Sequence, residues 1–241
     1  MQAPSTGVES TFSRSWELLT KNWVIIVPGL VIGFIVGIID YLVVPHTDAG
    51  GSSVVTGMAA AGGGLVAVIV NVVGEIVALC YVTGMAGAAW RRGKAELSDG
   101  SAAFQRDAGN TFIAMIGLFV VFIIAVILAI PTLTISLWLA LYFFIYTFAA
   151  AIVGERPGFA AMADSFRIST KRVGPTLIIV VIIAVIAVLS GIVGAVLSFI
   201  PFLGPIAAAV LSEIVLAYVT LVVVGEYLAL RDVPGVPPST P

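Results

Sequence analysis

Six long stretches of apolar residues dominate the sequence, and they restrict the chain to folds that cross a membrane. A helix needs about 20 mostly apolar residues to span ~30 Å of hydrocarbon. Of the 241 residues, 60% are hydrophobic and 10% charged, whereas a soluble domain carries ~45–50% and ~25%. This composition predicts an all-α, polytopic membrane protein and excludes disordered, collagen-like, coiled-coil and disulfide-scaffold chains. The predicted spans are 22–45, 64–90, 110–131, 132–153, 174–200 and 204–230.

Prolines divide the longest apolar stretches into hairpins. Pro131 interrupts the stretch 110–153, and Pro201 separates the last two spans. Proline pushes the preceding residue out of the α region and has no N–H to donate, so it ends a helix. A β-barrel would alternate apolar and polar residues, whereas the run from Leu177 to Leu189 is continuous. We therefore predict helices joined by tight hairpins.

The basic residues predict the orientation of the chain. All eleven lysines and arginines lie before the first span, in the second and fourth connections, or after the last span. By the positive-inside rule, both termini are then cytoplasmic, and we expect the protein in the plasma (inner) membrane. The first twenty residues carry Glu9 and Glu17 and lack the apolar core of a cleavable signal, so the first span is expected to direct insertion. We predict one membrane domain over 1–231 and a disordered, cytoplasmic tail at 232–241.

Amphipathic segments precede the odd-numbered spans. The segments at 8–20 and 157–173 each combine an apolar stripe at helical spacing with basic residues beside it, and a weaker segment at 98–110 is carried mainly by Phe104. This pattern is typical of helices that lie in the membrane interface. The residues that we expect at lipid headgroups are Phe12, Arg14, Trp16, Lys21, Trp23, Phe166, Arg167, Lys171 and Arg172.

The same segments indicate an internal repeat. Each of them leads into a span that ends at a proline, namely Pro45, Pro131 or Pro201. We predict a unit of interfacial helix plus transmembrane hairpin that occurs three times. The alternative is that any re-entry into a membrane favours an amphipathic lead-in.

Three short motifs resemble a known group of membrane proteins. They are the entry segment Phe12–Trp23, the central segment Gly154–Ile168 and the turn Pro201–Pro205. Together they resemble a broad group of uncharacterised bacterial and archaeal six-helix membrane proteins, which is similar to the membrane region of glycerophosphodiester phosphodiesterases. The resemblance implies a six-helix fold and a membrane-associated role. In those enzymes catalysis belongs to a separate soluble domain with metal-binding His and Glu residues, and this chain has a single histidine, His46.

Two glutamates fall within predicted spans. A central acid costs ~2.5–3.5 kcal/mol on insertion scales, so each one requires a reason. Glu75 lies near the middle of the second span, with Asn71 one turn before it, and Glu213 lies at a similar depth in the sixth. One hypothesis is a proton or cation site made of these three residues, facing the bundle interior. The alternative is that they form structural hydrogen bonds between helices.

Glycines spaced by four residues predict a close helix contact. Gly29, Gly33 and Gly37 share one face of the first span, and small residues at this spacing let helix backbones approach. The partner helix is either internal or in another subunit, so a homo-oligomer or a membrane-protein partner is one hypothesis. We expect no nucleic-acid partner, because the formal net charge is only −2.

No constellation for catalysis stands out in the sequence. Cys80 and the scattered hydroxyl residues lack a nearby histidine base, and we predict no catalytic residue, metal or cofactor. The leading hypothesis is a non-enzymatic membrane protein that acts as scaffold or accessory subunit and organises lipids or partner proteins. The alternative is a proton- or cation-coupled transporter or channel that uses the intramembrane carboxylates.

Overall fold

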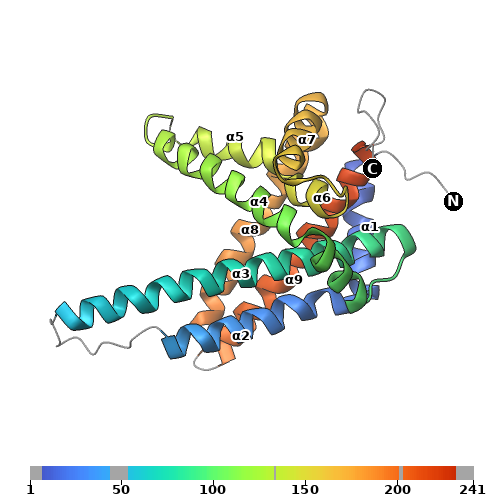
Figure 1. Cartoon of the computed structure of the whole chain (residues 1–241). Helices are drawn as coiled ribbons and strands as arrows, with labels where there is room; N and C mark the ends of the chain where they lie inside the picture. The colour runs from blue at the N-terminus through green and yellow to red at the C-terminus, as the bar shows by residue number, and fades with distance from the viewer. Residues whose placement is uncertain (1–6, 44–53, 133, 201–202, 232–241) are drawn as a thin grey trace.

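The computed structural model describes residues 7–43, 54–132, 134–200 and 203–231, and the regular structure in them is entirely helical. The predicted tail at 232–241 and the predicted helix ends at Pro45 and Pro201 lie outside these residues. The elements are α1 (Val8–Lys21), η1 (Trp23–Ile26), α2 (Val27–Val43), α3 (Val54–Arg92), α4 (Leu97–Ala129), α5 (Ile135–Phe144), α6 (Thr147–Ile152), α7 (Gly158–Lys171), α8 (Val173–Ser198) and α9 (Leu203–Arg231) (Figure 1).

The helices confirm the prediction of an all-α, multi-pass membrane protein. Five described segments are long and apolar enough to cross a membrane, and a sixth is added if α1 and Trp23–Ile39 count as one bent span. That pair is bent by 88°. The five segments are Ala67–Arg92, Leu97–Ala129, Ile135–Ile152, Val173–Leu197 and Ile206–Arg231.

The two amphipathic helices end in the same way. Both α1 and α7 have 14 residues, and the residue after each has nearly the same backbone conformation, with φ and ψ of −127° and 50° at Asn22 and −123° and 55° at Arg172. The next element begins at once, with η1 after Asn22 and α8 after Arg172. The chain therefore changes direction at a single residue.

Two helices are longer than the sequence suggested. We predicted a separate amphipathic segment at 98–110, but α4 runs unbroken from Leu97 to Ala129. Likewise α3 begins at Val54 and continues through Gly62–Gly64, ten residues before the predicted start of this span. Backbone hydrogen bonds within a helix tolerate glycine at a cost of only about 1 kcal/mol each, so the glycine run does not end α3.

The fourth span is broken where the sequence predicts one helix. It consists of α5 and the short α6, separated by Ile145 and Tyr146. Buried serines of α7 bind the backbone at this break: Tyr146 N–H donates to Ser165 Oγ (3.1 Å), and Ser165 Oγ donates to Phe143 O (2.9 Å). Ser169 Oγ donates to Tyr142 O (2.9 Å). A side chain that inserts into the backbone hydrogen-bond ladder bends a helix, and here the inserted groups come from α7.

Glycines join the ends of α3, α6 and α9. Gly87 of α3 faces Val153, which follows α6, and a Cβ on Gly87 would lie 2.9 Å from Val153 Cγ2. Gly154, the next residue, faces the Tyr227 ring of α9, and Gly225 of α9 faces the Trp90 ring of α3. The three ends thus form a closed ring of close contacts, which we call the glycine ring. The buried core includes residues from each of these ends, such as Ala89, Ala151 and Val224.

Beyond the glycine ring the hairpins diverge. In Figure 1 the pair α2–α3, the pair α4–α5 and the pair α8–α9 extend in different directions from the region around α6. Only 11% of the most apolar part of Val173–Leu197 and 17% of that of Ile206–Arg231 is buried within the chain. The core is therefore concentrated at one end, and most of the apolar surface of the spans is uncovered.

Candidate functional site

The structure brings the two intramembrane glutamates into one region, between α2, α3 and α9. Glu213 is half-buried on α9, and its carboxyl group packs directly on Gly29 of α2. Glu75 lies on α3, and the two carboxyl groups are close enough to act on each other electrostatically. A side chain at position 29 would occupy the space of the Glu213 carboxyl, so this glycine makes room for an acid.

The expectation that both glutamates face the bundle interior is wrong for Glu75. Its side chain is exposed in the single chain. Asn71 is exposed as well, and its amide donates to Ala67 O of the same helix (2.8 Å). The predicted set of Asn71, Glu75 and Glu213 is thus an open polar patch rather than an enclosed cavity.

The predicted interface residues of α1 pack partly on neighbouring helices. The Trp16 ring lies edge-on against Tyr218 of α9 at 5.9 Å, and Phe12 lies 6.4 Å from the same ring. Arg14 stacks over the Trp90 ring at 5.3 Å. Trp16 remains 56% exposed and Trp23 68% exposed. These two tryptophans are therefore available to lipid.

Lys21 of α1 forms an ion pair with Glu17 (2.6 Å), and both side chains are exposed. This pair links residues one turn apart on the helix surface, where such pairs contribute little to stability. Lys21 is thus held loosely at the end of α1, next to the change of direction at Asn22.

The corresponding residues of α7 are arranged differently. The Phe166 ring lies 4.8 Å from Phe143 of α5, and it is 46% exposed. Arg156 binds Asp164, and Arg167 lies 3.6 Å from the same carboxylate. The hydrogen bond to Asp164 raises the pKa of Arg156, because it stabilises the charged guanidinium.

Lys171 and Arg172 lie at the end of α7, and both are exposed. They correspond to Lys21 and Asn22, the last residue of α1 and the residue that follows it. Asn22 is buried, however, whereas Arg172 is open to the surroundings.

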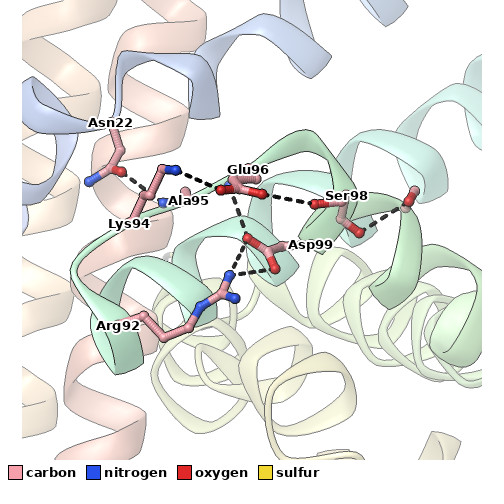
Figure 2. A network of polar contacts seen from close by, with 8 residues as sticks. Asn22, Arg92, Lys94, Ala95, Glu96, Ser98 and Asp99 are labelled. Atoms are coloured by element: carbon pink, nitrogen blue, oxygen red, sulfur yellow. Dashed lines mark hydrogen bonds and ion pairs between the residues drawn. The ribbon is translucent and has the colours of Figure 1, made fainter.

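Asn22 anchors the connection between α3 and α4 (Figure 2). Ala95 N–H donates to Asn22 Oδ1 (2.7 Å). Asn22 Nδ2 also donates to Gly93 O (3.2 Å). In the same connection Lys94 Nζ binds Glu96 (2.7 Å), and this contact lowers the pKa of Glu96. The bend after α1 is thereby tied to a loop about 70 residues further along the chain.

Glu96 and Asp99 form a capping box at the start of α4. Glu96 N–H donates to Asp99 Oδ2 (2.9 Å), and Arg92 binds both Asp99 oxygens (2.6 Å each). A capping box satisfies backbone N–H groups that have no partner inside the helix. The connection from α3 to α4 is therefore fixed at both of its ends.

Two acidic side chains are buried among the described residues, and sequence reasoning missed the first of them, Asp107. Asp107 of α4 is only 2% exposed and binds Arg106 (2.8 Å), which also reaches Glu155 (2.9 Å). Glu226 of α9 is 5% exposed and accepts a hydrogen bond from Thr11 of α1 (3.1 Å). The pairing of Asp107 with the adjacent arginine resembles a solvated surface pair in sequence, so nothing there signalled its burial.

The glycine stripe of α2 has two different environments. Gly29 is buried inside the chain, whereas a Cβ on Gly33 or Gly37 would meet no atom within 4 Å. Gly29 therefore serves a contact within the chain, and only the outer two glycines lie on a surface that a partner could reach. Within the described residues, no group of three or more His, Cys, Asp or Glu side chains is placed to hold a metal ion.

No protein family, curated protein or solved structure matches this chain.

Proposed function

We propose that this chain is a non-enzymatic integral membrane protein that organises lipids around its diverging hairpins, as a scaffold or accessory subunit. The observation that carries the proposal is the concentration of the core at the glycine ring, which leaves most of the spans' apolar surface uncovered. Apolar surface of this extent is covered by lipid tails or by other membrane proteins.

We infer that α1 and α7 lie in the cytoplasmic interface of the plasma (inner) membrane. The 88° bend after α1 supports this for the first of them, because a helix perpendicular to its span runs along the membrane surface. The exposed rings of Trp16 and Trp23 and the exposed Lys171 and Arg172 suit the headgroup region. The positive-inside rule supports the same orientation, with both termini cytoplasmic.

The threefold repeat remains our interpretation of the architecture. In its support, α1 packs on α9, the beginning of α4 packs on α3, and α7 packs on α5 and α6. Each amphipathic segment thus contacts the hairpin before it in a cyclic order. Ser15 and Ser165, at the same position in their helices, are both fully buried.

Spin-labelled lipids in reconstituted vesicles test this proposal. We expect the protein to restrict the motion of labelled phosphatidylglycerol more than that of labelled phosphatidylcholine, because basic residues near the surface favour anionic headgroups by about 1 kcal/mol each. Equal restriction of both lipids would contradict a role in organising lipids through these residues.

A second candidate function is proton or cation transport, and the proximity of Glu75 and Glu213 favours it. Flux of protons and of Na⁺ into vesicles is compared for the native chain, Glu75→Gln and Glu213→Gln. Glu17→Gln, which changes an exposed acid of α1, is the matched control. Flux that both intramembrane variants abolish and the control retains would favour the transporter over the scaffold.

A further inference from the structure

An apolar groove lies between the hairpin α4–α5 and helix α8. Its volume is about 600 Å³, and one side is formed by Ile135, Trp138, Leu139, Tyr142 and Phe143 of α5. Val173, Leu177, Val180 and Val181 of α8 form the other side, and Thr170 of α7 closes one end. A volume of this size is within the range of sites that hold a small ligand.

The groove has the length of one membrane leaflet. Along α8 its lining runs from Val173 to Val181, which at 1.5 Å per residue corresponds to about 12 Å. One leaflet contributes about half of the ~30 Å hydrocarbon core. On α8 the lining therefore begins at the junction with α7, and on α5 it extends from Phe143 to Ile135, the first residue of that span.

The hydroxyl groups in the lining are already bonded within the protein. Tyr142 Oη donates to Ser169 O (2.8 Å), and Thr170 Oγ1 donates to Phe166 O (2.9 Å). An apolar chain in the groove would therefore leave neither hydroxyl without a partner, and a polar ligand would gain no hydrogen bond from them. The interior of the groove thus favours hydrocarbon.

Positive charge lies at the interfacial end of the groove. Lys171 and Arg172 stand between the lining residues Thr170 and Val173, and both are exposed. At the corresponding end of α1, the residue in the place of Arg172 is Asn22, which is buried in the connection between α3 and α4. The combination of a leaflet-deep apolar groove and a basic end is found at the α7–α8 junction.

We propose that this groove binds one acyl chain of an anionic phospholipid, with the phosphate group at Arg172 and Lys171. This inference rests on the proposed function, because it assigns one defined lipid site to a protein that organises lipids. Charge complementarity selects an anionic phospholipid as the occupant over a zwitterionic one, and the depth of the groove matches a chain that enters from the interface.

Photo-crosslinking in vesicles tests the site. The full chain is reconstituted in phosphatidylcholine with a trace of phosphatidylglycerol that carries a diazirine on one acyl chain, and labelled peptides are identified by mass spectrometry. We expect labelling concentrated on 135–143 and 173–181, which excess phosphatidylglycerol suppresses and excess phosphatidylcholine does not. Uniform labelling of all lipid-exposed helices would overturn the proposal.

Three variants locate the contacts. Arg172→Gln should reduce labelling of the groove by about fivefold, the effect of one basic residue near the surface. Val181→Trp should reduce it by filling the groove, whereas Val188→Trp, on the same face two turns further and outside the lining, should not. If Val188→Trp and Val181→Trp reduce labelling equally, the groove is not the site.

Two further outcomes separate this site from the general function. If spin-labelled lipids show anionic selectivity but the groove is not labelled, the proposed function stands and the site is wrong. If Leu139→Cys in a Cys80→Ser background forms disulfide-linked dimers in vesicles, a second copy occupies the groove, and the lipid site is wrong. If neither selectivity nor labelling is seen, both proposals fail.

Discussion

Replacing Ser165 by alanine should destabilise the protein through the break between α5 and α6. Ser165 is fully buried, and its hydroxyl accepts from Tyr146 N–H (3.1 Å) and donates to Phe143 O (2.9 Å). Alanine removes both hydrogen bonds, so Tyr146 N–H loses its acceptor, while Phe143 O keeps the longer hydrogen bond from Ser169 Oγ (3.4 Å). Tyr142 O, the usual acceptor of Tyr146 N–H in a helix, accepts instead from Ser169 Oγ (2.9 Å).

The expected magnitude follows from the loss of the acceptor of Tyr146 N–H and of one of the two hydrogen bonds to Phe143 O. An unsatisfied buried donor or acceptor costs about 1–3 kcal/mol. Side-chain hydrogen bonds in membrane proteins average only ~0.6 kcal/mol, because the unfolded chain also finds partners. Taking both into account, we expect Ser165→Ala to lower the free energy of unfolding by about 1–3 kcal/mol.

Unfolding in mixed micelles with increasing SDS, followed by circular dichroism, measures this loss. Ser190→Ala is the matched control. Ser190 Oγ donates only within its own helix, to Ile186 O (2.7 Å), so its loss affects no helix break. If the two variants unfold at the same SDS fraction, α7 does not hold the break, and the explanation of the bent span is refuted.

Three further predictions concern the glycine ring, one loop charge and the cysteine. Gly225→Ala places a Cβ against the Trp90 ring, and we expect it to cost about 1–3 kcal/mol of unfolding free energy, measured in the same SDS titration. An unchanged midpoint of the SDS titration would contradict this prediction, because it would show that the glycine ring accommodates an added Cβ. Lys94→Met should raise the pKa of Glu96 toward its ordinary value, as measured by NMR of the side-chain carbon. The pKa of Glu96 is lowered in the folded protein, so its contribution to stability is present above the pKa of the unfolded chain and is lost as the pH falls through the pKa of the folded protein. If the pKa of Glu96 does not change in Lys94→Met, the contact with Lys94 is not what lowers it. Cys80 is fully buried, so maleimide should label it in SDS and not in mild detergent. Fast labelling in mild detergent would show that this part of α3 is not packed inside the protein.

The membrane character and the helix end at Pro131 could be predicted because they depend on local sequence. Apolar length defines a span, and Pro131 lies in the turn between α4 and α5 as predicted. The break at Tyr146 could not be predicted in this way. It depends on Ser165, 19 residues away in the chain, and nothing near Tyr146 resembles a helix end.

The candidate site was predictable in its residue types and not in its exposure. Helical spacing places Asn71 and Glu75 on one face of a span, but it does not tell which face a neighbouring helix covers. That depends on packing between helices that are far apart in the sequence. Gly29 illustrates the same limit, since its packing on Glu213 and the open surroundings of Gly33 are indistinguishable in a regular stripe of glycines.

The glycine ring also has a mechanical consequence. The glycine ring joins the hairpins near one end, and α8 alone is 26 residues, about 39 Å, long. A small rotation at a joint is magnified along such a lever, so the far ends can move by several ångströms while the contacts at the joint shift by fractions of one. A bilayer that thickens or thins imposes a tilt on its helices at a modest energetic cost. We therefore expect the angles between α3, α4 and α8 to follow membrane thickness, with the glycine ring as the pivot.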